Sequence, residues 1–198
     1  MQAALRAALL GRVQGWNFLA RPNLLTSPQA LDNAAWSKTN AAIVPDIMGG
    51  SGAPLTADKF IPNATTGLHL VNQSFAVTTG ANVLVGAVVA PSGLKNMLLR
   101  YSNSGETVAC QINADVAAGA ALSAASAYGG ATLPRGGVVR LSSGFCLVWV
   151  SGVLPGVGTG RLTLYGHNDA NAVSYAGNSV DGLAVWGLFA GLGVEPVT

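Results

Sequence analysis

The sequence predicts an all-β protein, folded as a two-sheet antiparallel sandwich and preceded by a short helical or extended arm. From position 23 onward, apolar residues recur mostly with a period of two, and clusters of Gly, Pro, Asn and Ser separate the apolar runs. No long helical pattern interrupts them. About eight or nine strands at this spacing are typical of two stacked antiparallel sheets.

The first 22 residues are the predicted arm, and residues 23–198 are the predicted domain. The arm begins with a leucine-bearing helical pattern too short to be stable alone, and then carries large apolar side chains beyond two glycines. It is expected either to dock onto a neighbouring subunit or larger particle, or to fold back over its own sandwich. The candidate docking residues are Leu5, Leu9, Trp16 and Phe18.

The expected strands follow one another through the domain, at residues 68–77, 83–90, 97–101, 108–112, 138–141, 145–154, 161–165 and 183–189. Between them, residues 114–130 are mostly small and are read as a loop or a weak strand edge. The glycines of residues 156–160 lead into a strand rather than a helix. They therefore indicate a hairpin turn and not a phosphate-binding loop.

Several strands are apolar on both of their faces, and residues 145–150 are the example. Phe145, Leu147 and Trp149 share one face, and the residues between them, Cys146, Val148 and Val150, share the other. A sandwich strand buries only one face against the partner sheet, so the N-terminal segment or another subunit is expected to cover the second. This pattern favours a homo-oligomer, with a trimer as the expected form.

Composition narrows the range of partners. Only 9% of the residues are charged, against about 25% in typical soluble domains, which favours a protein that packs against neighbours in an assembly. The net charge of +2 is small and scattered, so nucleic-acid binding is not expected. No apolar run reaches the roughly 18 residues of a membrane span, and no membrane insertion is expected. The N-terminus makes a poor signal peptide.

The two cysteines, Cys110 and Cys146, both lie in apolar strand patterns. Facing strands could bring them close enough for a disulfide. The favoured interpretation is two buried free thiols in a protein made in a reducing cytoplasm.

Three segments together resemble a known family. They are NLLTSPQALDNAAWSK at 23–38, PLTADK at 54–59 and GLAVWG at 182–187. They are similar to a jelly-roll module that recurs in tailed-phage particle proteins and looks like a carbohydrate-binding module. The resemblance implies a jelly-roll fold and a virion structural protein: a decoration, fibre or tail-associated subunit, made in the host cytoplasm and displayed on the particle surface. Its implied partners are other capsid or tail proteins and host surface polysaccharide.

The most polar stretch is the candidate glycan site. Sugar-binding sites combine an aromatic ring for the apolar face of the sugar with amide or carboxylate groups for its hydroxyls. Residues 165–178 supply these groups, and the candidates are Tyr165, His167, Asn168, Asn171, Tyr175 and Asn178. The alternative is an ordinary solvated loop whose Asn and Gly residues form turns. In that case the protein would be purely structural capsid cement without glycan binding.

Catalysis is not expected. The carboxylates are dispersed, the only histidines are His69 and His167, and no nucleophile-elbow or zinc-binding motif is present. Asp181 precedes the last strand, where related modules often hold a calcium ligand, but a single aspartate does not define a metal site. No cofactor and no metal are therefore predicted.

Overall fold

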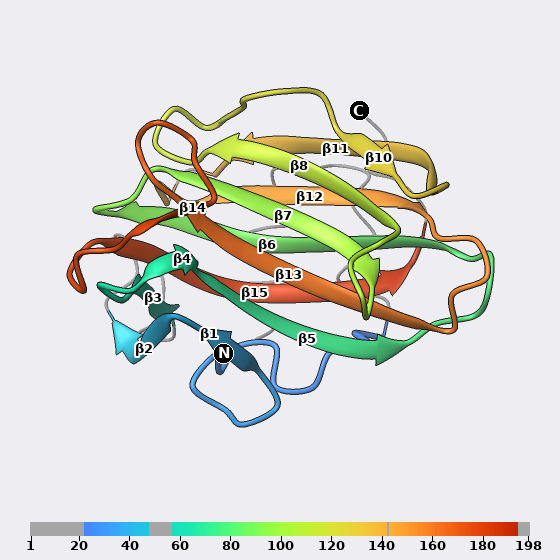
Figure 1. The fold of residues 1–198 in the computed structure, drawn as a ribbon, viewed down its shortest axis with the longest axis horizontal. Helices are drawn as coiled ribbons and strands as arrows, with labels where there is room; N and C mark the ends of the chain where they lie inside the picture. Colours follow the sequence, from blue (N-terminus) through green and yellow to red (C-terminus); the bar gives the residue numbers. More distant parts are fainter. Residues whose placement is uncertain (1–21, 48–56, 142, 194–198) are drawn as a thin grey trace.

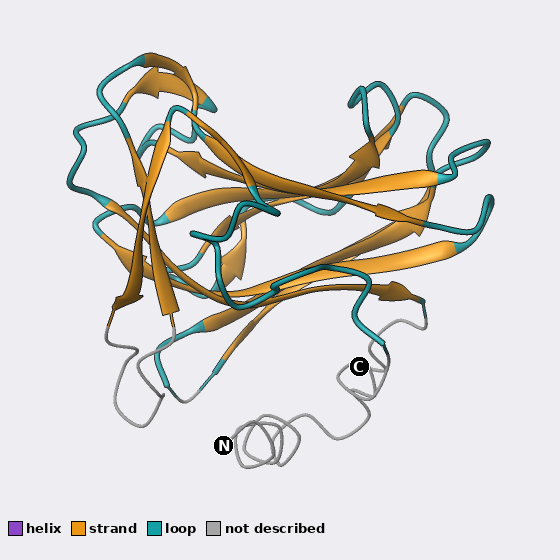
Figure 2. Cartoon of the chain, turned by 90° about the horizontal axis from the view of Figure 1, so that it is seen from below, coloured by secondary structure: helices purple, strands orange, loops and turns teal. Residues whose placement is uncertain are grey.

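The computed structural model describes residues 22–47, 57–141 and 143–193. These residues form fifteen strands and contain no helix. The strands form two large antiparallel sheets that lie face to face (Figures 1 and 2). The protein is thus an antiparallel sandwich of jelly-roll type, as the sequence predicted.

The first sheet, sheet A, lies in front of the second in Figure 1. Its spatial order is β1 (Ser37–Thr39), β5 (Leu70–Ala76), β13 (Thr159–His167), β7 (Asn96–Asn103), β8 (Ala109–Asp115) and β10 (Ser126–Tyr128), with the short β9 (Ala120–Ala121) also paired to β8.

The second sheet, sheet B, lies behind. Its order is β11 (Thr132–Arg140), β12 (Cys146–Val153), β6 (Asn82–Ser92), β15 (Gly182–Leu192), β3 (Ala57–Pro62) and β2 (Ala41–Ile47). A separate two-stranded sheet joins β14 (Ser174–Ala176) to β4 (Thr66–Leu68).

Each run predicted as a strand coincides with a strand of the structure or overlaps one. Residues 114–130 hold only the short β9 and β10, which agrees with the expected weak edge. Residues 154–158 turn the chain from β12 into β13, as the hairpin interpretation required. The sequence patterns did not predict β1, β2, β3 or β14.

The main core lies between the two sheets. Alternate residues of β6, from Val83 to Val89, face alternate residues of β7 and β13 such as Leu99 and Leu164. Leu31 and Trp36, from the segment before β1, join the same cluster and are almost completely buried. Burial of this apolar surface is the main force that holds the two sheets together.

Asn23 and Asp58, which belong to the segments that resemble the family, stabilise the fold through hydrogen bonds. The Asn23 side chain donates to the Leu188 carbonyl at 2.9 Å and accepts from the Ala190 amide at 3.0 Å, which ties the chain entry to β15. The buried Asp58 carboxylate accepts the amides of Leu31 and Asp46 at 2.5 and 3.1 Å. Burial raises the pKa of Asp58, although these two bonds act in the opposite direction.

A second apolar cluster lies on the outer face of sheet B, the face turned away from sheet A. We call it the sheet B cluster, and its members are Ala57, Leu84, Val88, Phe145, Leu147, Trp149, Ala184 and Phe189. The predicted two-faced strand is confirmed, because Cys146, Val148 and Val150 belong to the main core instead. All eight members are at most 7% exposed in the single chain, so their burial does not by itself require a second subunit.

Cys110 and Cys146 are both free and buried, as favoured. Trp36 lies in the main core. Trp186 is partly buried and packs against the sheet B cluster. The pairing of β15 with β6 shifts register between Trp186 and Phe189, and this bulge breaks the simple alternation of faces.

The candidate docking residues Leu5, Leu9, Trp16 and Phe18 lie outside the described residues, as does most of the predicted arm. Within the described part of the chain, no helix is long and apolar enough to cross a membrane.

Candidate functional site

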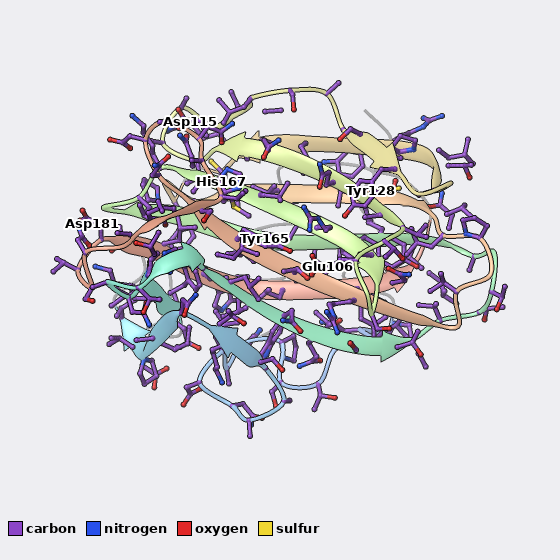
Figure 3. The ribbon with its side chains drawn as sticks, viewed as in Figure 1. Glu106, Asp115, Tyr128, Tyr165, His167 and Asp181 are labelled. Carbon is purple, nitrogen blue, oxygen red and sulfur yellow. The ribbon has the colours of Figure 1, made fainter. Side chains whose placement is uncertain are left out.

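Polar and aromatic side chains gather on the outer face of sheet A, the face turned away from sheet B. The strands β7, β8, β10 and β13 and the loop between β7 and β8 contribute to the group (Figure 3). We call it the sheet A cluster, and its members are Arg100, Glu106, Gln111, Tyr128, Arg161, Thr163 and Tyr165.

Strand alternation and register bring these residues together. Leu99 and Tyr101 face the main core, so Arg100 between them faces outward. Arg100 is paired with Gln111 on β8 and with Thr163 on β13. Three neighbouring strands therefore place polar side chains side by side on this face.

The loop between β7 and β8 adds a carboxylate to the face. The Asn103 side chain accepts the backbone amides of Thr107 and Val108 at 2.9 and 3.3 Å, and its carbonyl accepts the amide of Glu106 at 3.1 Å. Glu106 has a φ of 54°, in the left-handed region that a non-glycine residue rarely adopts. The turn directs the Glu106 side chain toward β13.

Glu106 is the electrostatic centre of the cluster. Its Oε2 atom accepts hydrogen bonds from Arg100 Nη1, at 2.5 Å, and from the Tyr165 hydroxyl, while its Oε1 accepts from Thr163 Oγ1 at 3.2 Å. Burial alone would raise the pKa of Glu106, but the bond from Tyr165, the charge of Arg100 and the bond from Thr163 together lower it. Glu106 is therefore held as a carboxylate.

The Arg100 guanidinium lies over two aromatic rings. Its Cζ atom is 4.8 Å from the centre of the Tyr165 ring and 5.8 Å from that of Tyr128, within the range of cation–π attraction. Its Nε donates to Gln111 Oε1 at 3.0 Å. Arg100 is thus fixed in place from several sides, which makes the centre of the cluster preorganised.

The two tyrosines of the cluster differ in exposure. Tyr165 is 2% exposed and supports Arg100 from beneath. Burial and the bond to Glu106 raise its pKa, so its hydroxyl stays protonated. Tyr128 is only partly buried, and its hydroxyl donates to the Glu106 carbonyl at 3.0 Å. Tyr128 is the ring better placed to meet a ligand.

Of the six residues predicted for glycan binding, the structure places Tyr165 and His167 on the outer face of sheet A. Both belong to β13, and His167 is also 2% exposed. His167 Nδ1 is 2.7 Å from Asn171 Oδ1, while its Nε2 has no hydrogen-bond partner among the described residues. Burial lowers the pKa of His167, and the charge of Arg100 lowers it further, against the effect of the Asn171 bond.

The remaining four predicted residues do not join the sheet A cluster. Asn168 Oδ1 accepts the Ala172 amide at 2.8 Å, and Asn171 bonds His167 within the same turn. The Asn178 side chain accepts the amides of Val180 and Asp181 and donates to the Asp181 carboxylate at 2.6 Å. Asp181 lies at the far end of the sandwich from Glu106 (Figure 3).

Tyr175 faces a different neighbour. Its ring centre is 4.6 Å from that of the fully buried His69, whose Nε2 is 2.8 Å from the Tyr175 carbonyl. Its buried hydroxyl has no hydrogen-bond partner in the described part of the chain. The asparagine side chains of the 165–178 segment thus bond mainly within their own turns, and glycan binding by the six predicted residues stays a prediction.

Reasoning from the sequence singled out Tyr165 but not Tyr128. It missed Arg100, Glu106, Gln111, Arg161 and Thr163. One signal was available: Arg100 is the single charge within the apolar run 97–101, and Arg161 and Thr163 alternate with leucines in the same way. Charges spaced by two along neighbouring strands indicate a shared polar face.

No group of three or more His, Cys, Asp or Glu side chains in the described residues is arranged to hold a metal ion. Asp181, the residue that the resemblance brings to attention, has Asn178 as its side-chain partner.

Neither a protein-family model nor a curated protein sequence matches this chain. Solved structures do match its fold. The carbohydrate-binding module TmCBM61, solved in complex with beta-1,4-galactotriose, is 9% identical, with a TM-score of 0.51 over 87% of this chain and 99% of that one. This chain therefore shares the jelly-roll fold of that module.

Two further structures match with lower TM-scores. The module CBM35 from Cellvibrio japonicus Abf62 is 13% identical, with a TM-score of 0.41 over 82% of this chain and 93% of that one. The enzymatically active domain of tailspike protein 4 from bacteriophage CBA120 is 12% identical, with a TM-score of 0.49 over 86% of this chain. This chain spans 21% of that tailspike chain.

Proposed function

We propose that the protein binds carbohydrate through the outer face of sheet A, as a non-catalytic module of a tailed-phage particle. One observation carries the binding proposal: two arginines, a glutamate, a glutamine and a partly buried tyrosine converge on one face of a sheet. Sugars are bound by this combination of an aromatic ring and planar hydrogen-bonding groups. The fold shared with TmCBM61, which was solved with a bound galactotriose, supports the same class of ligand.

Within this proposal the exposed parts of the cluster meet the sugar. The ring of Tyr128 offers an apolar surface, and Gln111 and Arg161 offer hydrogen bonds to hydroxyl groups. The buried Tyr165 and the partly buried Glu106 keep Arg100 in position and do not need to touch the ligand. The cost of ordering the site on binding is small, because the network already exists in the free protein.

The experiment is a glycan array probed with the purified protein, followed by calorimetry on the best ligand. Tyr128→Ala tests the sheet A cluster, and Tyr175→Ala tests the originally predicted 165–178 segment. Arg140→Gln, on the exposed edge of sheet B, is the control for a lost arginine. Binding that is abolished by Tyr128→Ala and kept by Arg140→Gln supports the cluster. Binding lost only in Tyr175→Ala would move the site to the segment, and no binding on any array would refute the proposal.

The particle context rests on the sequence resemblance rather than on the fold. The three matched segments resemble those of tailed-phage particle proteins, and two of them contain Asn23 and Asp58, whose structural contacts are described above. In this proposal Leu5, Leu9, Trp16 and Phe18 dock onto capsid or tail proteins, and the module assembles as a trimer on the virion surface. Mass spectrometry of purified particles tests the location, and light scattering at several concentrations tests the oligomer. Absence from the particle, or a monomer at all concentrations, would refute the respective part.

A purely structural cement is the second candidate function. It is favoured by the low charge of the chain and by the exposed apolar side chains Leu133 and Val180, which are 61% and 65% exposed. Particles that lack the protein would then lose heat resistance, while the purified protein would bind no glycan.

A further inference from the structure

Arg161 makes longer and weaker contacts than Arg100, the other arginine of the sheet A cluster. Its Nη1 is 3.9 Å from Glu106 Oε1, and its Nε is 3.4 Å from Ser74 Oγ, so both contacts are at the limit of their range. Its side chain is 25% exposed. Arg100, in contrast, makes bonds of 2.5 to 3.0 Å to Glu106, Gln111 and Tyr165. Arg161 therefore keeps donors available for a ligand.

A buried hydroxyl without a partner lies beside Arg161. Ser102 on β7 is paired directly with Arg161 on β13, and it faces outward because its neighbour Tyr101 faces the main core. Ser102 is completely buried, and its Oγ has no hydrogen-bond partner among the described residues. A buried hydroxyl without a hydrogen-bond partner destabilises the folded protein. A ligand oxygen that accepted a hydrogen bond from this hydroxyl would offset that cost, and binding would be favoured.

The local charge favours an anion. In the cluster two guanidinium groups face one carboxylate, which leaves one net positive charge. Glu106 is already neutralised by Arg100 and by the bonds from Tyr165 and Thr163. The other described charges on this face, Asp115 and the ion pair of Lys95 with Asp169, belong to the opposite ends of β7, β8 and β13. They lie too far along the strands to cancel Arg161.

We propose that Arg161, with the hydroxyls of Ser102 and Ser74, forms a subsite for the carboxylate of an acidic sugar such as a uronic acid. A planar guanidinium matches a carboxylate with two parallel hydrogen bonds, and serine hydroxyls add further donors. The subsite rests on the proposed function, since it defines which glycans the outer face of sheet A selects. The neutral parts of the sugar chain extend from it toward Tyr128 and Gln111.

The test uses two ligands that differ only in methyl esterification of their carboxyl groups, and therefore in charge: the trisaccharide of α-1,4-linked galacturonic acid and its fully methyl-esterified form. Calorimetry with the wild-type protein is expected to show the acid binding at least about tenfold tighter than the ester, because charge-assisted bonds are lost on esterification. The difference is expected to shrink in high salt.

Variants of the full chain locate the effect. Arg161→Gln is expected to remove the preference, so that the acid and the ester bind this variant with equal affinity. Arg161→Lys keeps the charge but not the planar fork, and is expected to retain only part of the preference. Ser102→Ala is expected to weaken acid binding a few-fold. Arg140→Gln is the matched control and is expected to behave as wild type. Near-UV circular dichroism checks that each variant is folded.

Three outcomes would overturn the subsite. If acid and ester bind the wild-type protein equally, the subsite fails while the proposed function stands. If inorganic sulfate at the same concentration displaces the acid but not the ester, and the acid monosaccharide binds no better than sulfate, the site is a general anion site and the sugar assignment fails. If neither trisaccharide nor any glycan of the array binds, the proposed function fails with it.

Discussion

The Tyr165 hydroxyl donates a hydrogen bond to the Glu106 carboxylate, 59 residues earlier in the chain. This bond fastens the loop between β7 and β8 to the middle of β13. The same hydroxyl accepts a hydrogen bond from Arg100 Nη1 at 2.8 Å, so three side chains from three segments share one centre. The geometry of the outer face of sheet A depends on it.

Removal of this hydroxyl is therefore expected to destabilise the fold. Tyr165→Phe keeps the ring beneath Arg100 but leaves a buried carboxylate oxygen with one donor fewer. We expect a loss of about 1–3 kcal/mol in the free energy of unfolding, measured with urea. Tyr128→Phe is the control, because its hydroxyl bonds only the Glu106 carbonyl from a more exposed ring. A Tyr165→Phe variant as stable as Tyr128→Phe would contradict this role.

Glu106 is expected to make stability depend on pH in the acid range. Its pKa is lowered from the ordinary value of 4.5 by Tyr165, Arg100 and Thr163, despite burial. A lowered pKa in the folded state means that the unfolded chain binds the proton more readily. The stabilisation from Glu106 is therefore complete above about pH 4.5 and is lost as the pH falls through the lower folded value.

Glu106→Gln tests this dependence. We expect the variant to be less stable than wild type at pH 7 by about 1–3 kcal/mol, because Arg100 loses its ionic partner. The two free energies of unfolding are expected to converge as the pH falls below 4.5. A constant difference between pH 7 and pH 3 would show that folding does not lower the pKa of Glu106.

The fold could be predicted further from the sequence than the site could. Alternation of apolar and polar residues predicts which side chains share a face of a strand. It therefore predicts that Leu99 and Tyr101 lie on one face and Arg100 on the other. The same alternation does not predict which strands lie next to each other in a sheet. β13 pairs with both β5 and β7, so Tyr165 meets Arg100 and Glu106 only through this strand order. The local pattern also fails where a bulge shifts the register, as at Trp186.

Composition alone also could not show whether the side chains of the 165–178 segment bind a ligand. Its asparagines looked like ligands for sugar hydroxyls, yet Asn168 and Asn178 accept backbone amides of their own turns. An asparagine side chain uses the same amide atoms to stabilise a turn and to bind a sugar hydroxyl. Only the backbone conformation shows which of these two roles it has.

His167 is expected to add a second pH dependence, at higher pH. Its Nδ1 donates to Asn171 Oδ1, so a further proton would go to the buried Nε2, which has no partner among the described residues. Burial lowers the pKa of His167 below its ordinary value of 6.5. The unfolded chain thus binds this proton first, and stability is expected to fall as the pH drops below 6.5 toward the folded value.

His167→Gln removes the titrating group and is expected to flatten this part of the profile. Urea unfolding at several pH values between 7.5 and 5 measures the slope, at roughly one-unit intervals so that the His167 region is separated from that of Glu106. Equal slopes for variant and wild type would assign the dependence to other groups.

Gly86 is expected to be intolerant of any side chain, because the ring of Phe189 occupies the space beside it. Gly86 on β6 pairs with Trp149 on β12 and with Phe189 on β15. A Cβ atom at Gly86 would overlap the Phe189 ring and would lie 3.0 Å from the Val148 carbonyl oxygen. We expect Gly86→Ala to cost about 1–3 kcal/mol of stability through overpacking of the sheet B cluster.

A double variant separates crowding from a backbone effect. Phe189→Leu shortens the ring's reach, so Gly86→Ala combined with Phe189→Leu is expected to lose less stability than the sum of the two single losses. Gly158→Ala is the control, since no atom lies within 4 Å of the added methyl group and its φ is not in the left-handed region. Strictly additive losses in urea unfolding would mean that the ring does not limit this position, and that the outer face of sheet B is packed more loosely than the structure shows.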